Sequence, residues 1–389
     1  MRRWRRHGLG LTVVASLLLL AIPAQARQPA VPEPGCDRPP TANASPSPST
    51  NLSAPAAHDP RVAELCLVAY LTGPDGINDT PARFGVDGTD LGHTFIHQGA
   101  LVMVFGDTFG PHEGDWRSNV AAVITDDDPS DGLTFDRMIE DRPGHAKALL
   151  PQTAVPGDEV TVIPTYGVSL GGRMVLHYMA VKRWGTPGRW DLNHSGLAYS
   201  DDDGQTWIVD PAATWLADSN FGQIAIVETG GIIYLFGIPG GRFGGVQLAR
   251  VAMDQILDMT SYEYWDGASW VPRDASAAAT LLPAPVGELS VRWSTYLGRW
   301  VMMYLNEAKA AIVLRTAECL TGPWSDEVTV VPGAQYPQLY APYLLPGENG
   351  GAEIYFTMSL FGPYQVTLMR TTLSDVPPSI AESECVDAG

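Results

Sequence analysis

Two glycine-flanked segments carry the aspartates that are best placed for acid–base chemistry. Gly85–Gly92 contains Asp87 and Asp90, and Phe105–Gly110 contains Asp107, 17 residues after Asp90. Two carboxyl groups that share a site can hydrolyse a glycosidic bond, because one protonates the leaving oxygen while the other attacks the sugar or activates water. An aspartate beside a glycine is also a common turn residue. The pair therefore predicts catalysis only if the fold brings both residues to one place.

Other catalytic patterns in the sequence are weaker. Gly167–Gly171 matches the G-x-S-x-G pattern of serine hydrolases. That pattern needs a strand followed by a helix, whereas a second strand-like run, Met174–Val181, follows here. His93 and His97 are four residues apart, a spacing that pairs metal ligands on a helix but not on a strand. The sequence predicts no metal site and no cofactor.

The elements that must position the aspartates are short β-type runs. From Val62 onward these runs are separated by Gly, Pro, Asn and Asp, and no segment keeps a 3.6-residue period. Four units contain four runs each and a fifth contains three, which leaves Leu65–Leu71 over at the N-terminal end. A ring of four-stranded sheets can take its missing strand from the other terminus. The sequence thus predicts an all-β fold, a five-bladed β-propeller closed by an N-terminal strand. The units cover about residues 90–135, 160–209, 223–265, 288–331 and 339–372.

A turn motif supports the propeller independently. Ser200–Trp207 matches S-x-D-x-G-x-T-W, the Asp-box of propeller hairpins, and Asp131–Phe135 is a degenerate copy of it. The motif is expected between the third and fourth strands of a blade, where its Asp accepts N–H bonds and its Gly takes a positive φ. Asp202 is therefore predicted to be structural.

Propeller geometry narrows the choice of site residues. In each blade the first strand starts, and the second strand ends, at the face that surrounds the mouth of the central channel. This places Asp90 and Asp107 together as the predicted catalytic pair. Carboxylates and guanidinium groups bind sugar hydroxyls and aromatic rings stack on sugars, so further residues near this face are predicted to bind substrate. They are Asp87, Trp116, Glu288, Arg292 and Tyr340.

The N-terminal segments predict export. Residues 1–26 combine a basic start, an apolar run over Leu9–Ile22 and a small-x-small site at Ala24–Ala26. This is typical of a signal peptide, and the run is shorter than the ~20 residues that span a bilayer. Residues 27–60 contain nine prolines and are expected to form a linker. Residues 61–389 are then the propeller domain with a short C-terminal tail, and the protein is expected outside the cell or in its envelope, without membrane insertion after cleavage.

The net charge indicates which kinds of partner the protein binds. The net charge is −19, and removing the four signal arginines leaves 20 basic against 43 acidic residues, a net charge of −23. Such a field repels nucleic acid and anionic sugars, so a neutral polysaccharide is the expected partner of a monomer.

The sequence contains four cysteines without a CxxC spacing, which favours structural disulfides over a zinc site and leaves three pairings open. They are Cys36, Cys66, Cys319 and Cys385.

Four segments carry a resemblance to a known family: Gly88–Gly92, Phe105–Phe109, Val291–Ser294 and Leu320–Ser325. Over about residues 62–372 the sequence resembles a secreted, largely actinobacterial family, long catalogued as a domain of unknown function and later assigned endo-D-arabinanase activity. The resemblance implies a five-bladed glycoside hydrolase that cleaves inside α-linked D-arabinofuranose chains of arabinogalactan and lipoarabinomannan. The matching motifs also imply that Asp90 and Asp107 are the catalytic carboxylates.

Two alternatives remain open on the sequence. One is a non-catalytic sugar-binding or envelope-scaffold propeller, which would tolerate Asp-to-Asn changes at the pair. The other is a sialidase, which needs an arginine cluster and a tyrosine nucleophile. Arg83, Arg242 and Arg292 could supply the cluster, but the Arg-Ile-Pro start motif is absent.

Overall fold

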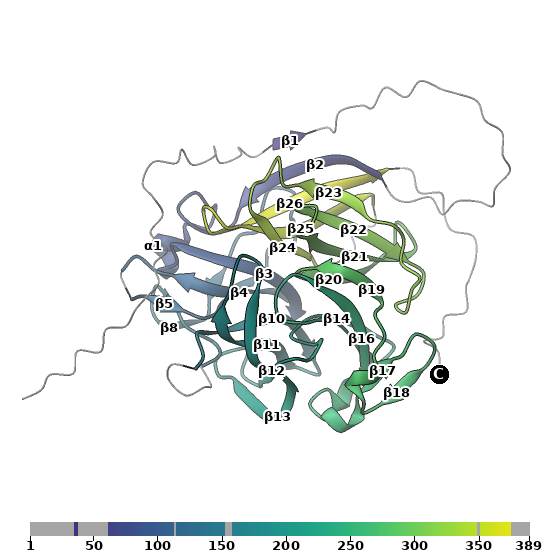
Figure 1. The fold of residues 1–389 in the computed structure, drawn as a ribbon. Coiled ribbons are helices and arrows are strands. Elements are labelled where there is room, and N and C mark those ends of the chain that lie inside the picture. The colour runs from purple at the N-terminus through teal and green to yellow at the C-terminus, as the bar shows by residue number, and fades with distance from the viewer. Residues whose placement is uncertain (1–34, 38–60, 113, 152–157, 348–350, 375–389) are drawn as a thin grey trace, which may run out of the picture. The chain divides into compact units, whose positions relative to one another are not determined.

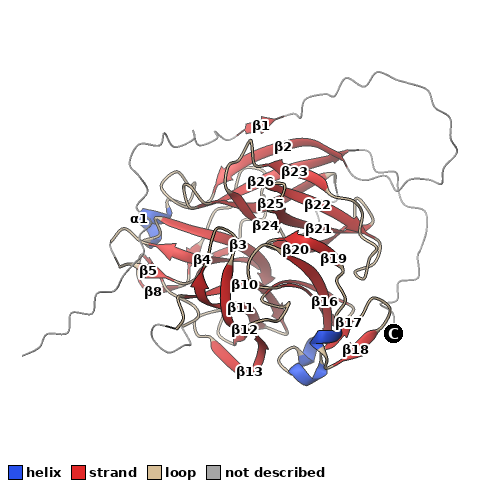
Figure 2. Cartoon of the chain, viewed as in Figure 1, coloured by secondary structure: helices blue, strands red, loops and turns tan. Residues whose placement is uncertain are grey.

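The computed structural model describes residues 35–37, 61–112, 114–151, 158–347 and 351–374. The predicted signal peptide and most of the predicted linker lie outside these residues. The regular secondary structure of the described chain is almost entirely strand, as predicted (Figure 2). Its helices are the five-residue α1 (Thr80–Phe84) and the 3-10 helices η1 (Met253–Gln255), η2 (Met259–Ser261) and η3 (Ala275–Ala277). None of the helices in the described ranges is long and apolar enough to cross a membrane.

Five antiparallel sheets form the blades of a β-propeller, which confirms the predicted fold (Figure 1). Blade 1 contains β3 (Gly88–His97), β4 (Ala100–Phe109), β6 (Val120–Ile124) and β7 (Arg137–Met138), with β5 (Trp116–Arg117) beside β4. Blade 2 contains β10 (Thr161–Leu170), β11 (Arg173–Trp184), β12 (Trp190–Ser200) and β13 (Ile208–Leu216). Blade 3 contains β14 (Gln223–Thr229), β15 (Ile232–Ile238), β16 (Gly244–Ala252) and β17 (Glu263–Trp265), extended by β18 (Trp270–Pro272) and β19 (Leu282–Val286). Blade 4 contains β20 (Leu289–Ser294), β21 (Arg299–Asn306), β22 (Ala311–Ala317) and β23 (Val328–Pro332).

Blade 5 is closed by the N-terminal strand, as the leftover run predicted. Its own strands are β24 (Leu339–Leu344), β25 (Glu353–Leu360) and β26 (Gln365–Ser374), and β2 (Arg61–Tyr70) pairs antiparallel with β26. The short β1 (Gly35–Asp37) lies on the other edge of β2, and β8 (Glu140–Arg142) pairs with β9 (His145–Ala146) in a separate hairpin. Because residues from both ends of the chain share one sheet, opening the ring requires breaking that sheet.

The Asp-box forms the turn that was predicted for it, between β12 and β13. Asp202 accepts hydrogen bonds from the Thr206 N–H at 2.8 Å and from the Thr206 hydroxyl at 2.7 Å. Gly204 has a φ of +83°, and the Trp207 indole N–H donates to the Gly204 carbonyl at 3.0 Å. Asp202 is therefore structural.

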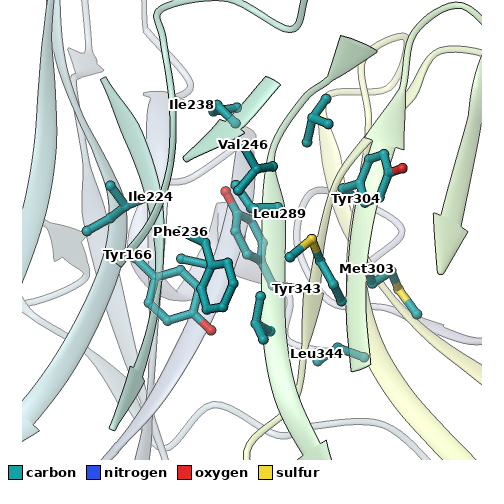
Figure 3. Packing of buried hydrophobic residues seen from close by; sticks show 14 of the residues in the cluster. Tyr166, Ile224, Phe236, Ile238, Val246, Leu289, Met303, Tyr304, Tyr343 and Leu344 are labelled. Atoms are coloured by element: carbon teal, nitrogen blue, oxygen red, sulfur yellow. The ribbon is translucent and has the colours of Figure 1, made fainter. Parts of the chain in front are cut away.

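The core lies where the inner strands of the blades face one another. Every residue of β24 is buried, whereas only two of the nine residues of the outer strand β13 are buried. Side chains from different blades meet in this interior, including Tyr166, Ile224, Leu289 and Tyr343 (Figure 3). A strand that is buried on both faces has a continuous apolar sequence rather than one that alternates between apolar and polar residues.

The structure describes the side chains of two of the four cysteines. Cys66 lies on β2 and Cys319 follows β22, and neither is a free thiol. The side chains of Cys36 and Cys385 lie outside the described residues, so structural disulfides and the choice among the three pairings stay predictions.

Candidate active site

A β-bulge aims Asp90 at the mouth of the channel. On the β3–β4 hairpin Thr89 pairs with Thr108, and the register then shifts so that Leu91 pairs with Phe105. Asp90 stands in this shift without a cross-strand partner. Leu91 has a φ of +66°, a conformation that costs a non-glycine residue free energy and is held by its surroundings. Bulges of this kind redirect a side chain away from the regular ladder.

Asp107 follows Gly106 on β4, so the hairpin brings the two aspartates together as predicted. A Cβ atom at position 106 would lie 2.5 Å from Asp90 Oδ1. Only a residue without a side chain lets the Asp90 carboxyl rest against this backbone. The closeness of the pair thus depends on a glycine between them.

Replacing Gly106 with Ala is expected to displace the Asp90 carboxyl and lower catalytic activity by about 100-fold, since small misplacements of a reacting group can cost that much. Steady-state rates on the substrate proposed below provide the measurement. A thermal melt checks that the variant is folded. Full activity in a folded variant would contradict this account of Gly106.

Four side chains hydrogen-bond the two carboxyl groups. Tyr340 Oη donates to Asp90 Oδ2 at 2.8 Å, and Tyr364 also donates to Asp90. Thr161 Oγ1 donates to Asp107 Oδ1 at 2.6 Å, and Trp116 donates to the same carboxyl. These donors come from blades 5, 2 and 1. The site therefore depends on the closed ring and not on the β3–β4 hairpin alone.

Burial raises the pKa of both aspartates, and neighbouring carboxylate charges raise that of Asp90 further. Burial, the charge of Asp107 and, more weakly, that of Glu288 raise the pKa of Asp90 to about 7, against the lowering effect of Tyr340 and Tyr364. Burial also raises the pKa of Asp107 to about 7, against the hydrogen bonds from its two donors. Because neighbouring carboxylates resist double ionisation, the pair holds one proton and one charge near neutral pH.

These pKa values predict a change of stability with pH. An aspartate with its ordinary pKa of 3.8 in the unfolded chain binds protons less tightly than Asp90 and Asp107 at about 7 in the folded chain. The stabilising contribution is therefore complete below about pH 4 and is lost as the pH rises through about 7. Urea titrations at about pH 5 and pH 8 should show a loss of stability in the wild type that the Asp90→Asn, Asp107→Asn double variant lacks. Equal losses would contradict the raised pKa values.

Arg242 holds Glu288 in place beside the pair. Its Nε lies 2.9 and 3.1 Å from the two carboxylate oxygens of Glu288, and its Nη2 lies 2.8 Å from Oε1. Its Nη1 reaches Glu307 at 3.3 Å, and its Cζ lies 4.6 Å from the centre of the Tyr340 ring. Glu288 is only 5% exposed. It is thus a fixed buried anion that raises the pKa of Asp90 through its charge.

Exposed aromatic rings flank the aspartates on two sides. Phe109 and Phe361 lie 5.4 and 6.1 Å, centre to centre, from the ring of Tyr364, the donor to Asp90. On the neighbouring blade 2, the exposed Trp184 packs on Trp190 with ring centres 5.7 Å apart. Flat, exposed rings on both sides of paired carboxyls can stack on sugar rings.

The structure brings most, but not all, of the predicted residues together. Trp116 and Tyr340 hydrogen-bond the aspartates and Glu288 is close enough to act on Asp90. Asp87 precedes β3, is exposed, and has its N–H bonded to the Phe109 carbonyl at 2.8 Å. Arg292 is not brought to the pair: it lies on β20, four residues after Glu288 in the chain, and lines a separate cavity.

Two site residues, Thr161 and Tyr364, were not predicted, and Arg242 was considered for the arginine cluster of a sialidase but not as the partner of Glu288. Thr161 begins a first strand and Arg242 and Tyr364 follow second strands, so all three lie where the strand-end rule places the mouth. The rule was applied to ionisable residues at the strand ends, so it did not select Thr161 or Tyr364, which follows a Gly-Pro pair in a turn.

The arginine cluster that a sialidase requires is not formed by the three arginines considered for it. Arg83 donates to the Phe135 carbonyl at 2.7 Å, away from the pair. Arg242 is occupied by Glu288, and Arg292 lies further along β20.

The G-x-S-x-G segment ends in a hairpin turn between β10 and β11, as predicted. Ser169 Oγ lies 2.8 Å from His97 Nδ1, and His97 Nε2 lies 3.0 Å from Asp203 Oδ1. These contacts join blade 1 to blade 2. The Asp203 side chain is 56% exposed, so water screens the carboxylate that would have to activate a catalytic histidine. We therefore interpret the three residues as a structural contact between the two blades.

His93 is separate from His97 in the structure. It is buried between Tyr166 and Tyr343, with ring centres 5.8 and 5.7 Å away, and burial lowers its pKa to about 3. Within the described ranges, no group of three or more His, Cys, Asp or Glu side chains could hold a metal ion.

The part of the chain that contains the candidate site matches a known protein family. Residues 75–370, which include both aspartates and all of the donors to them, match the family described as "Domain of unknown function (DUF4185)". The chain belongs to the DUF4185 family. Its relatives include the notoamide biosynthesis cluster protein J' of Aspergillus versicolor, 31% identical over 306 residues, which are 72% of this chain and 82% of that protein. Protein J of Aspergillus sp. (strain MF297-2) is 30% identical over 330 residues, 76% and 85% of the two chains.

Two solved structures were compared with this DUF4185 chain, and the first of them shares its fold. A Bacteroides ovatus protein, described as a candidate hydrolase, superposes with a TM-score of 0.53 at 14% identity, covering 74% of this chain and 86% of that one. The GH43_1 enzyme of Xanthomonas citri, solved with xylotriose, superposes with a TM-score of 0.47 at 14% identity, over 77% and 92% of the two chains. At these identities the likeness concerns the fold alone.

Proposed function

We propose that this DUF4185 protein is a secreted glycoside hydrolase that cleaves within the α-D-arabinofuranosyl chains of cell-wall arabinan. The observation that carries the proposal is the pair Asp90 and Asp107, held on adjacent strands with pKa values of about 7. One carboxyl that keeps its proton beside one that is ionised is the arrangement that glycoside hydrolysis requires. The motifs around the pair support arabinan as the substrate, and the predicted signal peptide supports secretion.

Asp90 is assigned the general acid. It lies close to two other acidic side chains, Asp107 and Glu288, whose charges raise its pKa. Its Oδ1 is buried and has no hydrogen-bond partner among the described residues. An ionised carboxylate in this position would be costly, so Asp90 keeps the proton and delivers it to the leaving glycosidic oxygen.

Asp107 is assigned the ionised partner. Thr161 and Trp116 donate hydrogen bonds that stabilise its carboxylate, and the Glu288 charge is not among the causes that raise its pKa. Once Asp90 protonates the leaving oxygen, positive charge develops on the sugar ring. Asp107 then attacks the anomeric carbon or takes a proton from the attacking water.

The aromatic rings and the overall charge support a neutral, extended substrate. Rings on both sides of the pair, Phe361 beside Tyr364 and Trp184 beside Trp190, allow a chain to continue past the cleaved bond in both directions. The excess of 43 acidic over 24 basic residues opposes an anionic polysaccharide.

The test is product release from purified D-arabinan by the wild-type chain, with L-arabinan and a sialoside as controls. The expected result is a series of D-arabino-oligosaccharides and no product from the controls. Binding of D-arabinan without product would instead assign a sugar-binding propeller. Sialic acid release would assign a sialidase.

A further inference from the structure

A cavity of about 360 Å³ lies at the far end of the strands that carry the site. Ile96 near the end of β3, Ser294 at the end of β20 and Leu344 at the end of β24 line it, whereas Asp90 and Tyr340 lie near the starts of β3 and β24. With a rise of roughly 3.3 Å per residue, Ile96 lies about 20 Å along β3 from Asp90. The cavity is therefore separate from the catalytic pair and lies towards the opposite face of the propeller.

Exposed aromatic side chains line this cavity. Trp293 is 40% exposed and Tyr296 is 44% exposed, and both belong to the β20–β21 hairpin. The Trp293 ring packs edge-on against Trp300, with centres 5.3 Å apart and an interplanar angle of 73°. Because the indole is braced from one side, it offers a preorganised surface to a ligand.

The polar side chains of the cavity are mostly held by the protein. Asp126 accepts the N–H groups of Asp128 and Thr134 at 3.2 and 2.9 Å. Glu353 accepts a hydrogen bond from Arg370 at 3.0 Å. These groups are fixed in position while each carboxylate keeps lone pairs free to accept further hydrogen bonds.

The balance of charge in the cavity selects the class of ligand. Three carboxylates, those of Asp126, Asp127 and Glu353, oppose binding of an anion. Two of the carboxylates already face protein donors, which disfavours a cation. Stacking rings beside hydrogen-bond acceptors suit a neutral polyhydroxylated ligand, and the volume falls within the roughly 300–1,000 Å³ of small-molecule sites.

We propose that this cavity is a second, non-catalytic site that binds a neutral glycan chain through Trp293 and Tyr296. The identity of the glycan as arabinan rests on the proposed function, but the class of ligand does not. A site on the opposite face would hold the enzyme on an insoluble polymer while the mouth remains free for cleavage.

The experiment measures retention of the full chain in gels that contain D-arabinan, L-arabinan or xylan, with the Asp107→Asn variant used to prevent hydrolysis. Adding Trp293→Ala or Tyr296→Ala to this variant is expected to weaken retention by about tenfold, the effect of losing a central aromatic contact. Leu216→Ala, which removes an exposed apolar side chain on β13, is the matched control and should change nothing. In an otherwise wild-type chain, Trp293→Ala should leave hydrolysis of short soluble oligosaccharides unchanged, which also shows that the variant folds.

The outcomes separate this proposal from the proposed function. Retention that depends on Trp293 in a chain that hydrolyses none of the polymers supports the second site and overturns the hydrolase. Hydrolysis with retention equal in the Trp293→Ala, Tyr296→Ala and Leu216→Ala variants overturns the second site and leaves the hydrolase standing. Free oligosaccharide is expected to compete with the glycan of the gel for this site and so to reduce retention of the protein. Trp293-dependent binding of an oligolysine peptide without any glycan binding would overturn the assignment of a neutral ligand.

Discussion

Asp107→Asn is expected to reduce the rate of D-arabinan hydrolysis by about 10²–10⁴-fold, the range in which a positioned acid or base contributes. The amide keeps the shape of the carboxyl and accepts the hydrogen bond from Thr161, which lies 2.6 Å from Asp107 Oδ1. It can neither attack the anomeric carbon nor take a proton from water. Initial rates of reducing-sugar release measure the effect, with thermal melts to confirm folding.

The matched control is Asp254→Asn, which changes an exposed aspartate on η1 of the same residue type. It should hydrolyse D-arabinan at the wild-type rate. If Asp107→Asn retained more than about a tenth of that rate, Asp107 would be a turn residue and not the ionised partner.

A change of leaving group separates the roles of the two aspartates. Asp90→Asn should lose activity on D-arabinan to a similar extent, because the amide cannot protonate the leaving oxygen. On an oligosaccharide with a 4-nitrophenolate leaving group, which departs without protonation, Asp90→Asn should regain most of its rate. Asp107→Asn should remain slow on both substrates. The reverse pattern would exchange the roles assigned to Asp90 and Asp107.

Much of the fold could be predicted because the propeller repeats a simple pattern. Each blade contributes four runs, so a blade with three runs and an unpaired Leu65–Leu71 at the other end of the chain pointed to closure through β2. The same regularity located Asp90 and Asp107, since strand ends alternate between the two faces. These inferences needed only the order of the strands.

The rest of the site could not be predicted because it depends on contacts between blades. Arg292 was expected beside the pair, but each residue along an extended strand moves about 3.3 Å, and four residues carried it to another cavity. Tyr364 reaches Asp90 from a turn whose φ of +54° no pattern of residue types indicates. Arg242 finds its partner on the next blade, 46 residues later.

Arg242→Met is expected to destabilise the protein by about 3–5 kcal/mol at neutral pH, the effect of removing one partner of a buried ion pair. The reason is Glu288, which is 5% exposed and would be left as a buried charge without its guanidinium partner. Urea titration gives the free energy of unfolding. The double variant Arg242→Met, Glu288→Gln removes that charge, so it should recover a large part of the loss.

The control for this prediction is Arg173→Met, which removes an equally well-formed but exposed pair. Arg173 lies 2.7 and 2.8 Å from the two carboxylate oxygens of Asp201, and water screens both partners. Its loss should cost less than about 1 kcal/mol. If Arg242→Met cost no more than this, water would have to reach Glu288 freely. Its charge would then be too screened to raise the pKa of Asp90, and the assignment of Asp90 as the proton donor would lose one of its supports.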